Sequence, residues 1–301
     1  MEMRQALCEC LDEMMAENEN IVVIDADLAK PNGTFPLRKK YPERAIDVGI
    51  AEQNMASVAA GMSSYGFIPF ITSFTPFASR RICDQIAISI AYAKQNVKII
   101  GSDPGISAEF NGGTHMSMED IGVLRSIPEL VIYEPVDVAQ FKQALPQIIA
   151  YEGPVYIRMF RKTIDDVFTN ADYKFDLFHA DCIQEGNAVT IFCSGIMVQE
   201  TMKANEILKQ EGIDAEIINI HTIKPIDRDA VVASAKKTGA VVVAENHNVI
   251  GGLTSAVCEV LMEEYPVPLR AVGVKDRFGQ VGKMPFLKEE YHMTAKDIVS
   301  A

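Results

Sequence analysis

Short apolar runs alternate with longer amphipathic stretches along the first half of the chain. The runs are rich in β-branched residues, as buried strands are. The stretches between them place apolar residues three and four positions apart, as amphipathic helices do. Together they predict a parallel sheet covered by helices on both faces. The predicted strands are 20–25, 67–72, 97–101, 130–135 and 154–159, and the predicted helices lie within 51–65, 75–95 and 136–153.

The alternation stops between 162 and 186, where the chain becomes polar and acidic with scattered aromatic residues. Such a composition is typical of a linker between domains. A shorter alternation follows, with predicted strands at 188–195, 214–220, 240–246 and 267–274 and predicted helices at 197–211, 227–237 and 252–264. We therefore predict an α/β fold with two α/β domains, at 1–165 and 187–301, joined by a linker at 166–186.

Composition and charge narrow the class of protein. The 301 residues are 48% apolar, which is enough to fill two cores, and carry a net charge of -13. That charge disfavours nonspecific binding to nucleic acid or to an anionic membrane. The first 20 residues read as an acidic amphipathic helix rather than a signal peptide, and no apolar run reaches the roughly 20 residues of a membrane span. We expect a cytoplasmic protein without nucleic-acid or membrane partners.

The cysteines indicate no metal site, and the common enzyme motifs are absent from the sequence. Six cysteines lie mostly in apolar stretches and read as reduced core residues. The closest pair, Cys8 and Cys10, points to different faces of a helix and lacks the spacing of a zinc site, so we predict no metal site in this chain. The sequence also lacks a P-loop, a nucleophile elbow and a dinucleotide-binding glycine motif after a strand.

Several polar and aromatic residues have both an ordinary and a functional interpretation. Glu52 lies in the first turn of a predicted helix, where an acidic side chain complements the helix dipole. Phe74 and Phe77 have the spacing of core residues, and His115 follows a glycine turn. Arg161 ends a predicted strand, where it suits either an exposed edge or an anion site. These segments, taken singly, leave the choice open.

Five motifs together resemble the carboxyl-terminal half of transketolase. They occur in the right order and spacing over essentially the whole chain, and they are "DVGIAEQNMAS", "SFTPFASRRICDQI", "NGGTHMSMEDIGVLRSIPELVIYEP", "YIRMFR" and "HTIKPIDRDAV". The resemblance implies a pyrimidine-binding domain followed by a carboxyl-terminal transketolase domain. It also implies thiamine diphosphate and Mg²⁺ as cofactors.

The resemblance assigns cofactor contacts to five residues. It makes Glu52 the carboxyl group that hydrogen-bonds the aminopyrimidine ring in a dry pocket and promotes removal of the proton from the thiazolium carbon. Phe74 and Phe77 become an aromatic wall for that ring. Asp27 matches an aspartate near the thiamine, and Arg80 falls where some relatives have a tyrosine and others an arginine.

The resemblance also indicates which residues contact the sugar substrate. His115 matches a group that faces the reacting carbons, while Arg4 and Arg161 match arginines that hold the terminal phosphate. Asp103 and Asn111 depart from the family, which commonly has a histidine and an aspartate at these positions. A carboxylate beside a dianion repels it.

The loop at 29–35 departs from the family as well, because it lacks the serine that relatives use to bind the anion. Together with the departures at Asp103 and Asn111, this missing serine leads us to expect an atypical substrate, either a sugar phosphate or a sulfonated sugar.

A second chain is implied too. The family holds the diphosphate and Mg²⁺ in a domain with a Gly-Asp-Gly start and a downstream asparagine, and this sequence has no such motif. We expect an obligate heterotetramer with an amino-terminal transketolase subunit, in which the chain alone is inactive. The carboxyl-terminal domain receives no catalytic residue.

The implied reaction is reversible transfer of a two-carbon ketol unit from a ketose to an aldose. A 1-deoxyxylulose-5-phosphate synthase type, which shares the "AEQ" motif, is an alternative, and the beta subunit of an alpha-ketoacid dehydrogenase is another. A noncatalytic regulatory homologue is a third. Retention of Glu52, Phe74, Phe77 and His115 favours an enzyme.

Overall fold

The computed structural model describes all 301 residues, from Met1 to Ala301. The chain divides into two compact units, Met1–Pro104 with Val123–Leu177 and Gly105–Gly122 with Phe178–Ala301. The division at 1–165, 166–186 and 187–301 stays a prediction. The compact units add one feature to it, because the segment 105–122 packs with the second unit.

The strands of the first unit form a parallel sheet. Their order is β5-β6-β4-β3-β1-β2, and every pairing between them is parallel. The central strands are buried on both faces, so they read as continuous apolar runs. The strands are β1 (Ile21–Asp25), β2 (Ala45–Asp47), β3 (Ile68–Phe74), β4 (Lys98–Ser102), β5 (Val131–Tyr133) and β6 (Val155–Met159).

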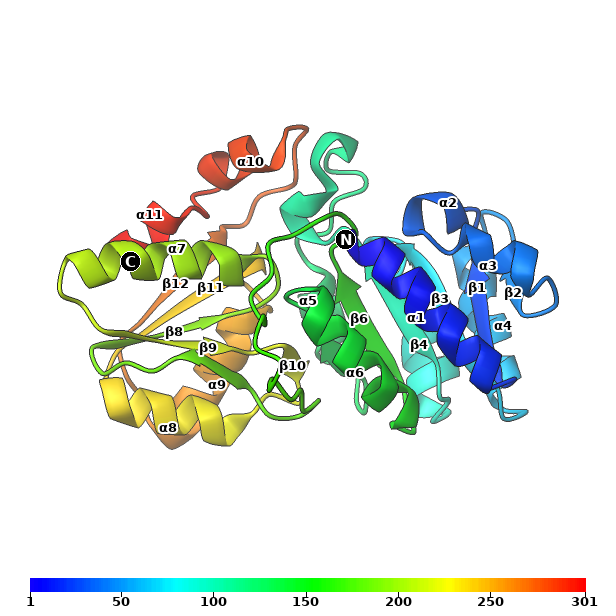
Figure 1. Cartoon of the computed structure of the whole chain (residues 1–301), viewed down its shortest axis with the longest axis horizontal. Coiled ribbons are helices and arrows are strands. Elements are labelled where there is room, and N and C mark those ends of the chain that lie inside the picture. Colours follow the sequence, from blue (N-terminus) through cyan, green and yellow to red (C-terminus); the bar gives the residue numbers. More distant parts are fainter. The chain divides into compact units, whose positions relative to one another are not determined.

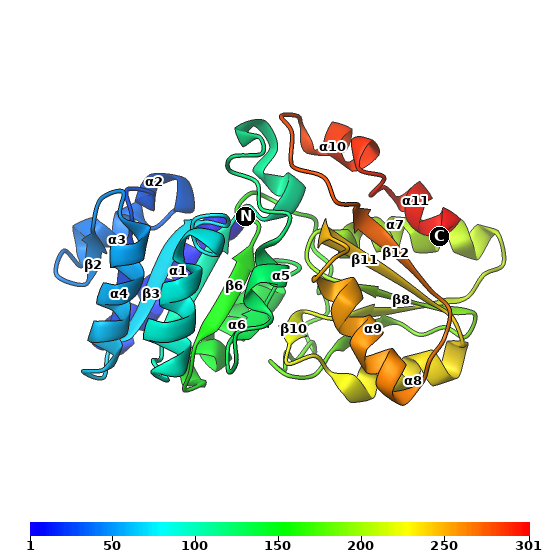
Figure 2. The ribbon, with the colours of Figure 1, turned by 180° about the vertical axis from the view of Figure 1, so that it is seen from behind.

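Helices cover both faces of this sheet. On one face α1 (Met3–Glu17) lies beside α6 (Val138–Ala150) (Figure 1), and on the other α4 (Glu52–Ser63) lies beside the π-helix η2 (Gln85–Tyr92) (Figure 2). Side chains of α1 and α6 join those of the strands in one apolar core. The shorter elements are α2 (Ala29–Asn32), α3 (Phe35–Lys40), η1 (Arg80–Ile82), η3 (Gly105–Asn111) and α5 (Asp120–Leu124).

The second unit is a smaller α/β sheet of order β12-β11-β8-β9-β7, in which β7 alone is antiparallel. Helices α7 and α11 cover one face, and α8 and α9 cover the other (Figures 1 and 2). The strands of this sheet are β7 (Asp181–Gln184), β8 (Val189–Cys193), β9 (Ala215–Asn219), β11 (Val241–Asn248) and β12 (Leu269–Val274), and β10 (Thr222–Lys224) lies outside it. Its helices are α7 (Met197–Gln210), α8 (Arg228–Thr238), α9 (Leu253–Glu264), α10 (Met284–Glu290) and α11 (Ala295–Ser300).

The predicted α/β fold is confirmed, and each predicted strand overlaps an observed one. The helix predicted within 75–95 is wrong in type, because the chain there forms the 3₁₀-helix η1 and then the π-helix η2. Apolar spacings of three and four do not distinguish an i+4 hydrogen-bond ladder from an i+5 ladder. The sequence therefore located this segment without giving its hydrogen bonding.

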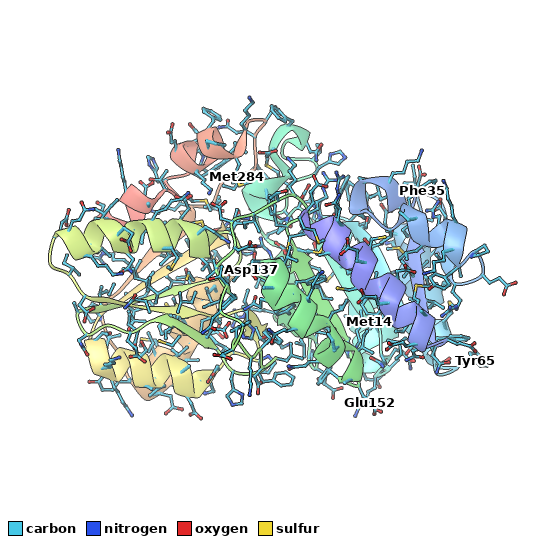
Figure 3. All side chains as sticks on the ribbon, in the orientation of Figure 1. Met14, Phe35, Tyr65, Asp137, Glu152 and Met284 are labelled. Atoms are coloured by element: carbon cyan, nitrogen blue, oxygen red, sulfur yellow. The ribbon has the colours of Figure 1, made fainter.

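The predicted linker is bound to the first unit over its first part. Asp137, labelled in Figure 3 at the start of α6, caps that helix by accepting from the Gln140 N–H at 2.8 Å. Its other oxygen accepts from the N–H groups of Val167 and Phe168, both at 2.7 Å. Farther along, Phe175 is buried against the ring of Tyr133. The second part of the linker contains the edge strand β7.

All six cysteines are free, as expected, but not all are core residues. Cys10 and Cys193 are buried, whereas Cys182 is exposed on the edge strand β7, so the core prediction is wrong for Cys182. None of the helices is both long and apolar enough to cross a membrane.

Lys98, the first residue of β4, is fully buried in the first unit. Its ammonium group donates to the carbonyl oxygens of Tyr151 and Gly153, both at 2.8 Å, just beyond the end of α6. Burial lowers the pKa of Lys98 to about 7. The side chain thus satisfies two carbonyl groups at the cost of removing an amine from water.

We expect Lys98 to make stability rise with pH. Below the folded pKa of about 7 the amine is protonated in both states, so the full cost of burying an ammonium applies. Between that pKa and the unfolded value of about 10.4, the unfolded chain binds the proton that the folded chain has lost, and the unfolding free energy increases. Lys98→Met should lack this rise when urea unfolding is compared at pH values of about 6.5 and 9.5. The exposed Lys94→Met is the control, and parallel pH dependence in wild type and Lys98→Met would contradict the assignment.

Candidate active site

Four buried carboxylates of the first unit each have an arginine beside them. Asp25 ends β1, Asp103 follows β4 and Glu134 follows β5, while Glu52 opens α4. The carboxyl ends of parallel strands meet at one edge of a sheet, where ligands of open α/β sheets bind. Burying a carboxylate is costly unless a cation accompanies it. The pairs are Asp25–Arg38, Glu52–Arg81, Asp103–Arg161 and Glu134–Arg158.

Glu52 has the position that the sequence predicts, as the first residue of α4. Its side chain is only 5% exposed, and Arg81 Nη1 donates to its Oε1 at 2.6 Å. The helix start also favours the negative charge. Glu52 is thus a carboxyl group in a nearly dry environment with a cationic donor in contact.

Arg81 is a residue that the sequence analysis missed. Its guanidinium carbon lies 3.8 Å from the centroid of the Phe77 ring, and the Phe74 and Phe77 rings are 6.2 Å apart. The Gln53 side chain donates to the Arg81 carbonyl oxygen at 3.3 Å. The predicted residue, Arg80, is its neighbour in the chain, and both arginines are exposed. Two adjacent arginines carry no sequence signal of which one contacts Glu52.

The Arg81 contacts test whether this corner suits an aminopyrimidine. A guanidinium is planar, carries N–H donors and stacks on aromatic faces. Arg81 uses these properties by stacking on Phe77 while donating to Glu52. A planar heterocycle with an N–H or amino donor needs the same two contacts. Glu52, Phe74 and Phe77 therefore fit the predicted cofactor ring.

Arg4 and Arg161, predicted to hold the terminal anion, lie together. Their Nη1 atoms donate to the same carbonyl oxygen, that of Pro31, at 3.4 and 3.1 Å. The Arg4 N–H also donates to the Arg161 carbonyl oxygen at 3.0 Å. The Arg161 guanidinium carbon is 4.9 Å from the centroid of the Phe74 ring. The two cations and the aromatic wall thus belong to one region of the first unit.

Asp103 is paired rather than free. It is 1% exposed, and its carboxylate accepts from the Arg161 Nε and the Arg161 backbone N–H. Burial raises the pKa of Asp103, and the Arg161 guanidinium offsets part of that rise. The repulsion of a dianion expected from the sequence assumes an uncompensated carboxylate. In the structure the Asp103 charge is offset by the Arg161 charge.

Arg4 is also paired with an acid, because its Nε donates to Glu2 at 2.7 Å. The arginine cluster, which we define as Glu2, Arg4, Asp103 and Arg161, therefore contains two cations and two carboxylates. Glu2 is 30% exposed, so water screens its charge more than that of Asp103. The cluster has a formal charge near zero.

Asn32 is a second residue that the sequence analysis missed. It is fully buried, and its Oδ1 accepts from the Ser102 hydroxyl at 2.7 Å. Its Nδ2 has no hydrogen-bond partner within this chain, and neither has the buried hydroxyl of Thr34. An asparagine between proline and glycine reads as a turn residue in a sequence. The structure instead makes it a buried amide next to Pro31, on which the two arginines converge.

Asp27 lies in the turn after β1 with a positive φ of 62°. Its side chain is exposed, and its backbone N–H donates to Asp47 at 3.0 Å. The buried acid of this turn is Asp25, which Arg38 contacts at 2.6 Å while also pairing with Asp47 at 3.0 Å. Burial raises the pKa of Asp25 in spite of Arg38. Nothing in the sequence pattern indicates that Asp25 is the buried acid and Asp27 the exposed one.

Asn111 and His115 belong to the second unit. Asn111 is exposed, and His115 is half-buried with its Nδ1 2.8 Å from the Thr114 hydroxyl. The Gly112 carbonyl accepts from the N–H groups of His115 and Met116, which forms a tight turn. His115 thus lies on an ordered turn rather than on an extended loop.

Outside these regions, Cys182, Glu185 and Glu216 place possible ligand atoms within 4.8 Å of one another in the second unit. Lys237 lies among them, because its ammonium group donates to Glu216 at 2.7 Å and also to Glu185. The single Lys237 charge thus offsets part of the charge of the two glutamates.

Removing Arg81 should leave Glu52 buried without its cation. We expect Arg81→Met to lower the unfolding free energy of the chain by about 1–2 kcal/mol more than Arg80→Met. Arg81 is 43% exposed, and water therefore reduces the cost below that of a fully buried pair. Urea titrations of both variants measure the difference, and in the Glu52→Gln background it should vanish. Equal costs in the two backgrounds would show that Arg81 stabilises the chain without Glu52.

Family models and known proteins match the chain over nearly its full length. Residues 1–165 match the transketolase pyrimidine binding domain, and residues 179–298 match the transketolase C-terminal domain. The chain is 53% identical over 299 residues to the 6-deoxy-6-sulfo-D-fructose transketolase subunit SqwH of Clostridium sp. (strain MSTE9), covering 99% of this chain and 92% of that protein. It is 38% identical over 298 residues to a putative transketolase C-terminal section of Methanocaldococcus jannaschii, covering 98% and 93%.

A solved structure described as a split gene transketolase, inactive beta4 tetramer, has the same fold. It superposes with a TM-score of 0.90 at 43% identity and covers 100% of this chain and 96% of that chain. The two matched domains follow each other in the order that the motifs imply. This chain therefore belongs to the transketolase family.

Proposed function

We propose that this chain is the carboxyl-terminal subunit of a thiamine diphosphate-dependent transketolase. It transfers a two-carbon ketol unit from a ketose, phosphorylated or sulfonated at its far end, to an aldose phosphate. The observation that supports this most is the nearly buried Glu52 beside Phe77, with the planar donor Arg81 in contact with both. That corner offers a ring two contacts, one aromatic face and one carboxyl group.

The residues of the first unit receive distinct roles toward the cofactor. Phe74 and Phe77 hold the aminopyrimidine by stacking. Glu52 accepts a hydrogen bond from the ring at its carboxyl oxygen, and its burial keeps water from competing. Arg81 yields its place on Phe77 to the ring, and Asp27 lies near the thiamine. Thiamine diphosphate, when bound, supplies a nucleophilic carbon and an electron sink for carbon–carbon cleavage.

The sugar is held by the remaining residues. Arg4 and Arg161 bind the terminal anion, and Asn32 Nδ2 offers them an additional neighbouring donor. His115 handles a proton at the reacting carbons, and Asn111 contacts a sugar hydroxyl. These roles suit the side chains, because guanidinium groups bind oxyanions and an imidazole can transfer protons near neutral pH.

The charge of the arginine cluster favours a sulfonated donor. A sulfonate is a monoanion, whereas a phosphate monoester carries about -1.5 to -2 at neutral pH. Because two carboxylates offset the two arginines, the cluster offers a dianion little net attraction to repay its desolvation. The relative that is 53% identical is described as a subunit of a transketolase for 6-deoxy-6-sulfo-D-fructose. We propose a sulfonated ketose as the preferred donor.

A partner chain completes the enzyme in this proposal. The sequence lacks the Gly-Asp-Gly motif that holds diphosphate and Mg²⁺ in the family. Relatives of similar length are described as a subunit and as a C-terminal section, and a related structure is described as an inactive tetramer of beta chains. We propose an obligate heterotetramer with an amino-terminal transketolase subunit that holds the diphosphate and the metal.

Reconstitution tests the proposal. The chain should show ketol transfer only with the amino-terminal partner, thiamine diphosphate and Mg²⁺, and should use 6-deoxy-6-sulfofructose better than fructose 6-phosphate or xylulose 5-phosphate. A coupled assay of aldehyde release measures each donor. In the same complex Glu52→Gln should lower turnover by about 10²–10⁴-fold, with the exposed Glu19→Gln as its control. Full turnover by Glu52→Gln, or no transfer from any of the donors, would refute the proposed reaction.

The charge argument predicts a change of donor preference in Asp103→Asn. This variant keeps the shape of the side chain and tolerates the positive φ of 53°, while it leaves Arg161 without a compensating charge. We expect kcat/KM for phosphorylated donors to rise about tenfold relative to the sulfonated donor.

Glu2→Gln is the matched control for Asp103→Asn, because it removes the other carboxylate of the arginine cluster. It should act in the same direction with a smaller effect, since water screens the partly exposed Glu2 more than the buried Asp103. If the ratio of kcat/KM between phosphorylated and sulfonated donors stays constant in Asp103→Asn, the charge argument is contradicted. The proposed ketol transfer would be unaffected by that result.

A further inference from the structure

The histidine loop, which we define as Gly105–Gly122, carries Asn111 and His115 and packs with the second unit. Strand β11 holds both of its ends. The Asn246 Oδ1 accepts from the Ile106 N–H at 3.0 Å, and the Asn248 N–H donates to the Met118 carbonyl oxygen at 2.7 Å. The two ends of the loop are therefore fixed to the end of one strand.

The middle of the histidine loop is held by a second element, which we call the clamp segment and define as Gly279–Met284. A Cβ on Gly113 would lie 2.6 Å from the Gly279 carbonyl oxygen. A Cβ on Gly279 would lie 2.4 Å from the Met116 Sδ and 2.8 Å from the Met116 Cβ. Both positions need glycine, because a Cβ on Gly113 would overlap the Gly279 backbone and a Cβ on Gly279 would overlap the Met116 side chain.

A side chain completes the contact between the loop and the clamp segment. Glu109 has φ 48° and ψ -115°, an uncommon conformation for a residue with a Cβ. Its Oε1 accepts from the N–H of Met284, the first residue of α10, at 3.0 Å. Figure 1 shows α10 beside this loop, and Figure 3 labels Met284 there.

We propose that the clamp segment is a positioning element for Asn111 and His115, and that it acts through Gly279 and through the contact of Met284 with Glu109 of the histidine loop. This rests on the substrate roles proposed above for Asn111 and His115. Catalytic groups have to stay within about 0.5 Å of their productive positions. His115 follows Gly113 by two residues and precedes Met116, and the clamp segment contacts both of these neighbours. The carboxyl-terminal domain, to which the sequence assigned no catalytic residue, thereby sets the geometry of the residues that handle the sugar.

Gly279→Ala in the reconstituted complex tests the proposal. The added methyl group displaces Met116 and with it the histidine loop, so kcat/KM for the ketose donor should fall about 10- to 100-fold. Binding of thiamine diphosphate should stay unchanged, because Glu52, Phe74 and Phe77 lie in the first unit. Amide hydrogen exchange of residues 109–116, measured by mass spectrometry, should accelerate in the same variant.

Gly239→Ala is the matched control for the stability of the second unit. Gly239 ends α8 with a φ of 74°, and a Cβ on it would meet no atom within 4 Å, so the alanine strains the backbone without touching the histidine loop. It should lower the midpoint of urea unfolding and leave the exchange of residues 109–116 unchanged. Equal exchange and equal kcat/KM in Gly239→Ala and Gly279→Ala would overturn the proposal.

Glu109 offers a second test in case Gly279→Ala fails to fold. Glu109→Gln keeps a carbonyl oxygen that can accept from the Met284 N–H, whereas Glu109→Ala removes the acceptor. Loss of kcat/KM and faster exchange in Glu109→Ala, with rescue in Glu109→Gln, would support positioning. If the wild-type complex shows no ketol transfer, the proposed function fails, and the exchange data still decide whether the clamp segment orders the loop.

Discussion

A carboxylate that leaves water needs a cation, and this requirement organises the first unit. Asp25, Glu134 and Asp103 end or follow three different strands of one parallel sheet, and each is at most 2% exposed. Removing a carboxylate from water costs several kcal/mol unless a cation and hydrogen bonds compensate it. Arginine from a neighbouring element supplies both in each case. The loops at this edge are therefore fixed by charge pairing as much as by apolar packing.

The second unit orders its candidate residues by a different physical means. Around the histidine loop two close contacts involve glycine, because the Gly279 carbonyl oxygen lies against Gly113 and the Met116 side chain lies against Gly279. These two contacts hold the loop without adding a charge to it. The position of His115 can thus be set through its own backbone, while its Nδ1 lies beside the Thr114 hydroxyl.

Much of the fold was accessible from the sequence, because buried parallel strands and amphipathic helices have distinct periodicities. Every predicted strand was found, whereas the short strands β2, β7 and β10 were missed, since three or four partly exposed residues carry no such signal. The π-helix was missed because its spacing resembles that of an α-helix.

The site was less accessible than the fold. Motifs supplied Glu52, Phe74 and Phe77, but the contacts of Arg81 and Asn32 depend on tertiary neighbours 29 and 70 positions away. The membership of 105–122 in the second unit was likewise invisible, because it arises from contacts with Asn246 and Gly279 far along the chain. Sequence order places that segment among the strands of the first unit. Only the folded chain shows which backbone it lies against.

In the proposed function, the charge balance of the arginine cluster, rather than its number of arginines, decides which anion it accepts. Arg4 and Arg161 converge on one carbonyl oxygen, and alone they would form a strongly positive site suited to a dianion. Glu2 and Asp103 cancel that charge while leaving N–H donors in place. Hydrogen bonds from a nearly neutral cluster suit a monoanion, because a sulfonate accepts several donors and needs less countercharge than a phosphate. In the proposed function, one buried carboxylate beside an existing arginine is therefore enough to alter the charge balance of the cluster.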